Sequence, residues 1–211
     1  MRSVHRSAGL DAVAGSARVT RVSTQEAQRM LGGLPYDPRD PVLVRARRRA
    51  RTITHDYNHA APGDGALRAR LLKRLLGRCG KGVVVVPPFH CDYGTYIELA
   101  DDVFVNMQCV VLDCARVTVG ARTLLGPGVM LLAATHPVSA LERRSGLESA
   151  APIHLGEDVW LGGGVIVCPG VTIGARAVVG AGSVVTRDLP SDVVAAGNPC
   201  RVLRAIPSAA R

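Results

Sequence analysis

The chain has few aromatic residues and few lysines for its length of 211 residues. Only seven side chains are aromatic, and Lys73 and Lys81 are the only lysines, whereas glycine occurs 23 times. A core with so few rings must be built from Val, Leu, Ile and Ala, and abundant glycine favours short strands separated by tight turns. The aromatic platforms of single-strand nucleic-acid binders are missing, so we predict no nucleic-acid partner.

Long apolar runs and paired cysteines are also missing. No stretch approaches the length of a membrane span, and the six cysteines form neither a CxxC pair nor a zinc-type spacing. With no secretory signal, we predict a cytoplasmic protein with reduced thiols, no membrane association and no metal. The net charge of +9 is compatible with an anionic ligand, and its one dense run is Arg45–Arg51.

Aliphatic residues recur every six positions through the C-terminal half. The first column is Leu155, Leu161, Val167, Ile173, Val179 and Val185. The second column, two positions earlier in each repeat, is Ile153, Val159, Val165, Val171, Ala177 and Ser183. The same frame occurs earlier at Leu99, Val105, Val111 and, after a slip of two positions, at Val119, Leu125, Leu131.

A repeat of six predicts a parallel β-helix. Six is a multiple of the two-residue period of a strand, so every repeat points the same side chains inward. Three short strands joined by tight turns make one coil of about 18 residues. Leu155 and Ile173 should then stack on successive coils. The frame breaks off after Leu131, and residues 137–152 form a polar inserted loop.

The segment before the repeats has a helical pattern. Residues 42–59 are basic and compatible with a helix, and residues 64–79 place several leucines on one helical face. Asp64 is the expected N-cap, and Gly77 or Gly80 the expected stop. We therefore predict a helical cap and acceptor-site segment over residues 25–82 and a β-helix over residues 83–204, which begins with a strand at 83–88.

Both ends of the chain are expected to be tails. Residues 1–24 are rich in Ser and Arg with a single acid, which predicts a disordered extension; a weaker alternative is a transit peptide. Residues 205–211 are expected to form a short C-terminal tail.

Seven sequence motifs resemble the maltose/galactoside O-acetyltransferase family of hexapeptide-repeat acyltransferases, in order and spacing. The resemblance runs from about Thr24 to Ile206. The motifs are GGLPYDPRDP at 32–41, YNH at 57–59, PPFHCDYG at 87–94, VFVNMQCVVLD at 103–113, ATHPV at 134–138, DVWLGGGVIVCPGVTIG at 158–174 and AAGNPCRV at 195–202. The fold class implied is β: a single-stranded left-handed parallel β-helix of hexapeptide repeats with a small N-terminal helical cap.

The resemblance implies an acyltransferase that moves an acetyl group from acetyl-CoA, as co-substrate, to a hydroxyl of a sugar or glycoside. It also implies a homotrimer with active sites between subunits, and it makes His136 the general base. A neutral imidazole can take the hydroxyl proton as the oxygen attacks the thioester, then return it to the CoA thiolate.

The remaining site residues are carried over from the same motifs. The acceptor-binding positions are Asp37, Asp92, Asn106 and Asp113. The CoA-binding positions are Trp160, Gly163, Ala181, Thr186, Arg187, Arg201 and Arg204. The chain departs from the family at Cys114, where many galactoside-type members have a second acid, and at Arg187, where lysine is common. The acceptor sugar is therefore left open.

Each of these residues also has a structural interpretation. Asp92, Asn106 and Asp113 can serve as corner residues of the coil, Trp160 as surface packing, and Arg201 and Arg204 as solvated charges. Two alternative functions remain. A zinc-dependent, carbonic-anhydrase-like hydratase on the same scaffold would use His90, His136 and His154 as ligands, and a non-catalytic scaffold would not need His136.

Overall fold

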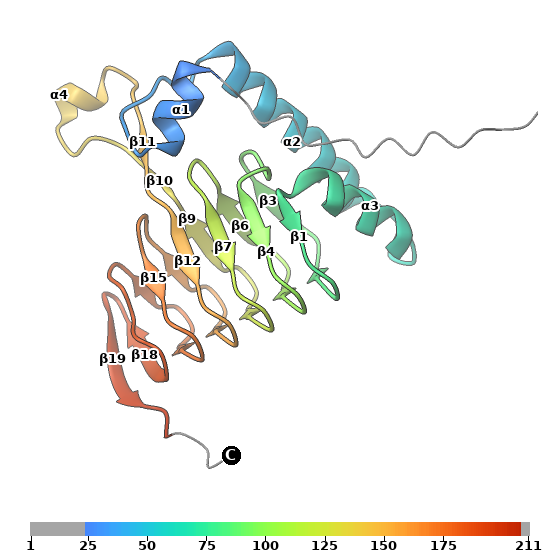
Figure 1. The fold of residues 1–211 in the computed structure, drawn as a ribbon, viewed down its shortest axis with the longest axis vertical. Helices are drawn as coiled ribbons and strands as arrows, with labels where there is room; N and C mark the ends of the chain where they lie inside the picture. Colours follow the sequence, from blue (N-terminus) through green and yellow to red (C-terminus); the bar gives the residue numbers. More distant parts are fainter. Residues whose placement is uncertain (1–23, 208–211) are drawn as a thin grey trace, which may run out of the picture.

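The computed structural model describes residues 24–207, most of which form a prism of stacked β-coils (Figure 1). The predicted tail over residues 1–24 lies outside the described residues except for Thr24, and residues 208–211 of the second predicted tail do so as well. The last strand of the described chain continues to Ala205, which is the first residue of the predicted C-terminal tail.

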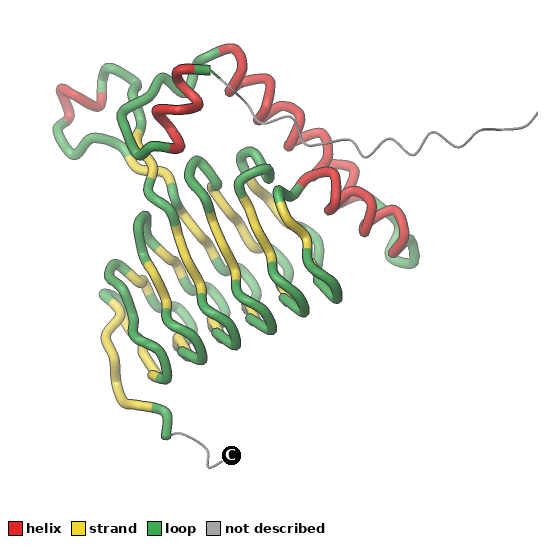
Figure 2. The backbone as a smooth tube through the Cα atoms, in the orientation of Figure 1, coloured by secondary structure: helices red, strands yellow, loops and turns green. Residues whose placement is uncertain are grey.

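Short strands alternate with turns along each coil (Figure 2). In chain order they are β1 Arg78–Cys79, β2 Val84–Val85, β3 Phe89–Cys91, β4 Ile97–Leu99, β5 Phe104–Val105, β6 Cys109–Leu112, β7 Val117–Val119, β8 Leu124–Leu125, β9 Met130–Leu132, β10 Ala134–Thr135, β11 Ser149–Ala150, β12 Ile153–Leu155, β13 Trp160–Leu161, β14 Ile166–Val167, β15 Thr172–Ile173, β16 Val178–Val179, β17 Val184–Val185, β18 Val193–Gly197 and β19 Cys200–Ala205.

All strands except β10 and β11 form three sheets, which are the three faces of the prism. The first face contains β1, β4, β7, β12 and β15; the second contains β2, β5, β8, β13, β16, β18 and β19; the third contains β3, β6, β9, β14 and β17. Within these faces all neighbours are parallel except β18 and β19, which form an antiparallel pair. The predicted parallel β-helix is confirmed.

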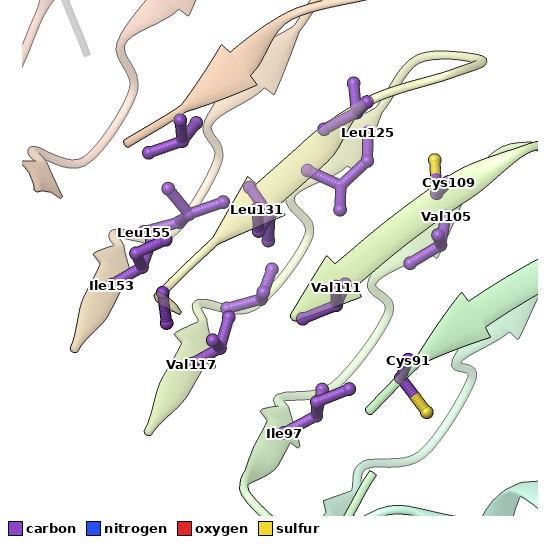
Figure 3. Close-up of a cluster of buried hydrophobic side chains, with 14 of the residues drawn as sticks. Cys91, Ile97, Val105, Cys109, Val111, Val117, Leu125, Leu131, Ile153 and Leu155 are labelled. Atoms are coloured by element: carbon purple, nitrogen blue, oxygen red, sulfur yellow. The ribbon is translucent and has the colours of Figure 1, made fainter. Parts of the chain in front are cut away.

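The interior of the prism is filled by the aliphatic columns seen in the sequence (Figure 3). All twelve residues of the two predicted columns are buried. Leu155 pairs with Ile173 one coil further on, as expected. On the third face, Val111, Leu131 and Val167 lie in register and are almost completely buried. Such columns leave little room for rings, which explains the small aromatic content.

The coils differ in length, and the difference is confined to one edge. Glu98 pairs with Arg78 and with Thr118, each twenty positions away, whereas His154 pairs with Thr172, eighteen positions away. The extra residues lie where the third face turns into the first, and the long insertion leaves the coil there too. We call this the irregular edge; it comprises residues 92–96, 113–116, 133–152, 168–171 and 186–191.

Three helices precede the coils: α1 Gln25–Leu31, α2 Pro41–His59 and α3 Gly65–Leu75. The helices α2 and α3 lie over the N-terminal end of the prism, and α1 lies beside β10 and β11 of the insertion (Figure 1). Asp40 caps α2 by accepting from two backbone N–H groups, and Asp64 caps α3 as predicted. Leu43, Ala50 and Ile53 turn one face of α2 toward the core.

The helical cap ends and the β-helix begins earlier than the sequence pattern indicates. α3 stops at Leu75, because the backbone N–H groups of Gly77 and Gly80 bond to the second coil, at Ile97 and Leu99. An added Cβ at Gly80 would lie 2.5 Å from Ala100, so this approach requires glycine. The first strand is therefore β1, and the strand expected at 83–88 is the second.

The insertion after β9 is an ordered excursion. β10 pairs antiparallel with β11, and the short helix α4, Ala140–Arg143, lies between them. The excursion projects from the prism toward α1, and β11 packs against that helix (Figure 1). The N-terminal cap and the inserted loop therefore meet beside the irregular edge.

All six cysteines lie among the described residues, and none of them forms a disulfide there. In the part of the chain that the structure describes, no helix combines the length and the apolarity needed to cross a membrane.

Candidate active site

The predicted residues Asp92, Asp113 and His136 follow three successive strands of the third face. Asp92 follows β3, Asp113 follows β6, and His136 comes just after β9 and β10, so the irregular edge brings the three positions side by side. The alternation of the strands then orients them. Asp92 comes directly after the inward Cys91 and points outward, whereas Asp113 lies two positions after the inward Val111 and points inward.

Asp113 is completely buried. One carboxylate oxygen accepts from the backbone N–H of Tyr93 at 2.8 Å, and the other from that of Tyr96 at 3.2 Å. Burial raises the pKa of this carboxyl to about 7. Asp113, which was predicted to bind the acceptor, therefore stabilises the turn of residues 93–96 from inside the coil and does not reach the surface.

His136 lies in the excursion and is accessible, with 56% of its side chain exposed. Its Nε2 atom lies 4.0 Å from Oε1 of Glu148, which directly precedes the returning strand β11. The other oxygen of Glu148 accepts a 2.7 Å hydrogen bond from the buried Tyr36 hydroxyl. Backbone bonds in both directions between Tyr36 and Glu148 fix this arrangement.

A pocket of about 310 Å³ opens beside this pair. It is lined by Pro38, Arg39, Arg47, Arg51, Asp92, Cys114 and Glu148. The lining is mostly polar and combines guanidinium donors with carboxylate acceptors. A ligand with several hydroxyl groups matches such a lining, because a hydroxyl both donates and accepts.

The arginines of the pocket are held by the N-terminal segment. Arg47 donates to the Tyr93 hydroxyl at 2.7 Å and to the carbonyl of Pro38 at 2.5 Å. Arg39 pairs with Asp37 at 2.8 Å and donates to the carbonyl of Ser145 in the inserted loop. Asp37, predicted as an acceptor contact, is not in the lining; it positions Arg39, which is.

Cys114 lies beside Asp92 in the lining of the pocket. Its Sγ donates to Oδ2 of Asp92 at 3.4 Å. Burial raises the pKa of the Cys114 thiol, and the nearby Asp92 carboxylate raises it further. The Cys114 thiol is thus neutral, and it forms part of the pocket lining at the position after Asp113.

Asn106, Gly163 and Ala181 lie on a different edge. They follow strands of the second face, on an edge that we call the glycine edge and that comprises residues 106–108, 126–128, 162–164 and 180–182. The backbone there is bare: a Cβ added at Gly164 or Gly182 would meet no atom within 4 Å. A thin flexible chain can therefore lie close against this edge.

The remaining predicted CoA positions are spread over the C-terminal coils, and all are exposed. Trp160 stands on the second face, Thr186 and Arg187 lie on the irregular edge after β17, and Arg201 and Arg204 belong to β19. The prism separates Trp160 from His136, since the second face lies opposite the irregular edge. Within one chain, only Thr186 and Arg187 of the predicted donor positions share the irregular edge with His136.

The three histidines of the zinc alternative are also separated. His90 belongs to β3 on the third face, and His154 belongs to β12 on the first face, where its Nδ1 lies 2.8 Å from the Thr118 hydroxyl oxygen. Among residues 24–207, no cluster of three or more His, Cys, Asp or Glu side chains is placed to hold a metal ion.

The sequence patterns missed Tyr36, Arg39, Arg47, Cys114 and Glu148. Arg47 and Arg51 are four positions apart and share a face of α2, so the helical period could have paired them. The repeat frame shifts by two positions after Val111, and this shift in the sequence marks the position of the irregular edge. Nothing in the local sequence places Glu148 beside His136, since that contact needs the loop to return.

In chemical terms, the site offers an accessible imidazole next to a carboxylate that lines a polar pocket. Such an imidazole can take a proton from a bound hydroxyl. The pocket itself offers groups that orient a polyhydroxylated ligand, and Asp92 and Glu148 supply its charged acceptors.

The sequence matches two protein-family models and is similar to known acetyltransferases. Residues 29–80 match the maltose acetyltransferase hexapeptide capping motif, and residues 152–187 match the bacterial transferase hexapeptide repeat. The galactoside O-acetyltransferase of Escherichia coli K12 is 39% identical over 78% of this chain and 81% of its own length.

Two solved structures have the same fold over most of this chain. The maltose O-acetyltransferase of Clostridium difficile 630 is 39% identical, with a TM-score of 0.86 over 88% of this chain and 99% of its own. A hexapeptide-repeat acetyltransferase of Vibrio cholerae, complexed with acetyl coenzyme A, is 37% identical, with a TM-score of 0.82 over 88% of this chain and 100% of its own.

Proposed function

Because the chain belongs to the maltose/galactoside O-acetyltransferase family of hexapeptide-repeat acyltransferases, we propose that it transfers an acetyl group from acetyl-CoA to a sugar hydroxyl, with His136 as the general base. The observation that carries the proposal is the position of the accessible His136 imidazole, 4.0 Å from a carboxylate oxygen that lines a polar pocket.

In the proposed reaction, Nε2 of His136 takes the proton of the bound sugar hydroxyl while the hydroxyl oxygen attacks the thioester carbonyl. The C–S bond then breaks, and the imidazolium returns the proton to the leaving thiolate. Glu148, anchored by the Tyr36 hydroxyl, places a negative charge near the imidazolium while it exists. Between these two steps the former carbonyl oxygen carries a negative charge, which a hydrogen-bond donor must stabilise.

A sugar acceptor is supported by the lining of the pocket. Arg39 and Arg47 present fixed donors, and Asp92 presents a fixed acceptor. Relatives that are named for galactoside and maltose acetylation support the same class of acceptor. We propose the pocket as the acceptor site and leave the identity of the sugar to experiment.

The glycine edge is the proposed binding surface for CoA. Its bare backbone around Gly163 and Ala181 suits a thin pantetheine arm, and Arg201 and Arg204 at the end of the second face suit the phosphate groups. The acetyl-CoA complex of the Vibrio cholerae relative supports this donor. Asn106 on the same edge is then closer to the donor than to the acceptor pocket.

A homotrimer is part of the proposal, because the proposed donor site on the glycine edge and the proposed acceptor pocket at the irregular edge lie on different edges of one chain. The outward side chains of the second face form an apolar stripe in register: Val84, Phe104, Leu124, Trp160, Val178 and Val194. On the third face they are His90, Val110, Met130, Ile166 and Val184. Two different apolar faces suit a heterologous contact that closes into a ring and completes sites between copies.

The proposed function is tested by thiol release from acetyl-CoA across a panel of sugars, with His136→Ala as the control. We expect release with at least one sugar and a loss of turnover on the order of 10²-fold or more in the variant. Release that is unaffected by His136→Ala would contradict the role of the base. Absence of release with every sugar would contradict sugar acetylation and favour the scaffold alternative.

A further inference from the structure

The positive charge of the described chain is concentrated on the helical cap. Residues 41–75, which form α2, α3 and their connection, contain nine arginines or lysines and two acids. Residues 76–207, which form the coils and the insertion, contain ten arginines or lysines and eleven acids. The excess of arginine is therefore a local property of the cap, and the proposed CoA positions on the coils do not account for it.

The exposed cations of these two helices lack counter-charges. We call them the cap basic surface; it comprises Arg45, Arg48, Arg49, Arg51, Arg70, Lys73 and Arg74. Among residues 24–207, none of them forms an ion pair with a carboxylate. Asp64 caps α3 instead, and Asp56 lies beside His55. Arg49 donates to the backbone carbonyl of Arg74, and burial together with the neighbouring Arg74 guanidinium lowers the pKa of Arg49. A bound anion would relieve this repulsion between like charges.

One row of this surface leads to the proposed acceptor pocket. Arg45, Arg48 and Arg51 are neighbours on α2, because residues three positions apart on a helix lie side by side. Arg51 lines the pocket together with Arg47. Successive Cβ atoms of the row are about 5–6 Å apart, which is close to the length of one sugar unit in a saccharide chain. A saccharide with one sugar in the pocket can therefore extend along α2.

The side chains around the row favour an acidic saccharide over other polyanions. The only Tyr, Phe or Trp of residues 41–75 is Tyr57, which is buried and donates to the Val85 carbonyl, so no aromatic ring of these types is available for stacking on bases. No large apolar side chain of residues 41–75 is exposed, so the helices have none to insert into a bilayer. Guanidinium groups suit carboxylates, which they can bind through two parallel hydrogen bonds.

We propose that the exposed arginines of α2 bind an acidic glycan, a saccharide chain with carboxylate groups, and lead one of its sugars into the pocket. The inference rests on the proposed acetyl transfer for the role of the pocket, and it adds the class of saccharide that reaches it. The cap basic surface does not touch the reacting atoms, so it affects the binding of the acceptor and leaves the chemical step unchanged.

The first test measures binding by isothermal titration calorimetry. Full-length protein is titrated with an oligogalacturonate, in the presence of excess CoA so that the proposed CoA surface is occupied. The methyl ester of the same oligosaccharide is the uncharged comparison, and double-stranded DNA and vesicles that contain phosphatidylglycerol are the other polyanions. The variant is Arg45→Gln/Arg48→Gln. The matched control is Arg78→Gln/Lys81→Gln, which removes two exposed cations beside Glu98 and Asp101 on the first coil.

We expect the wild type to bind the oligogalacturonate more tightly than its ester, with an affinity that falls as salt screens the exposed charges. Arg45→Gln/Arg48→Gln should weaken this binding about threefold to thirtyfold, and the control should bind as wild type. Equal binding of acid and ester, or equal losses in the variant and the control, would overturn the inference. Tighter binding of DNA or of the vesicles would overturn the glycan as the partner.

The second test asks whether the bound glycan enters the pocket. Acetyl transfer to a neutral sugar is measured at saturating acetyl-CoA with increasing oligogalacturonate. We expect the oligogalacturonate to raise the apparent KM for the sugar without changing kcat, and to do so less in Arg45→Gln/Arg48→Gln. An effect on kcat alone would contradict the path into the pocket. If the wild type acetylates no sugar, the proposed function fails, whereas the calorimetry still decides whether the cap binds an acidic glycan.

Discussion

Asp92 and Asp113 follow neighbouring strands of the same face, yet only Asp92 reaches the pocket. Counted from the last inward residue of each strand, Cys91 or Val111, the first position points outward and the second inward, so Asp113 is enclosed while the next residue, Cys114, borders the pocket. Residue type alone could not separate these roles, because both carboxylates lie in motifs of the same kind. The strand period separates them once the last inward residue is known.

Burial of Asp113 predicts a pH-dependent stability. Its folded pKa of about 7 lies above the value of 3.8 for an exposed aspartate, so the native state holds the proton more tightly. Its contribution is complete below pH 3.8 and is lost as the pH rises through 7, with a slope of at most about 1.4 kcal/mol per pH unit.

The measurement is urea unfolding of wild type and Asp113→Asn between pH 4 and 8. The variant cannot titrate at this position, so the wild type should lose free energy of unfolding relative to Asp113→Asn as the pH rises. A constant difference between the two proteins across this range would contradict the assignment.

Among the elements, the inserted loop connects the most distant parts of the site. It leaves the coil after β9, returns through β11, and contacts the N-terminal segment through Glu148 with Tyr36 and through Ser145 with Arg39. Both contacts span more than 100 positions of sequence. The loop therefore sets the wall of the pocket as well as the position of His136.

Shortening the tip of the loop tests this role. Replacement of residues 138–146 by a short Gly-Ser linker keeps His136, Glu148 and the strands β10 and β11, but it removes the Ser145 carbonyl that holds Arg39. We expect a higher KM for the sugar and a nearly unchanged KM for acetyl-CoA, because the proposed CoA surface lies on the glycine edge. Steady-state kinetics with each substrate varied in turn provides the measurement, and an unchanged KM for the sugar would refute the role of the tip.

For the whole molecule, the three faces of the prism differ in the chemistry of their outward side chains. The first face presents a polar column of Arg78, Glu98, Thr118, His154 and Thr172. The second and third faces present apolar columns, and Leu124 and Trp160 remain about half exposed in the single chain. Copies of the chain that cover these two faces would leave the first face to solvent.

A charge on the second face should therefore prevent assembly. Leu124→Lys places an ammonium group in the middle of the apolar stripe, next to Trp160, whereas Thr172→Lys places the same group on the polar face. Light scattering after size exclusion should report a monomer for the first variant and a trimer for the second. Acetyl transfer should fall together with the trimer, and a trimeric Leu124→Lys protein would contradict this surface as the interface.

The repeat of six determined the fold before any tertiary information, because inward and outward positions of a strand follow from its period and the buried column can be counted along the chain. Motif order likewise indicated the family and the position of His136. The ends of the elements depended on contacts outside the local sequence: α3 stops at Leu75 because its continuation pairs with the second coil.

The pocket was decided by the tertiary structure. Arg47 on a helix, Asp92 on the third face and Glu148 on a returning loop have no common sequence pattern, and they meet because the irregular edge, the cap and the insertion converge there. The strand period buries Asp113, and the three-faced coil places the proposed donor edge away from the edge that carries His136. In a repetitive coil, the sequence period identifies the buried residues. The candidate active site instead forms where the repeat is interrupted and segments that are distant in sequence come together.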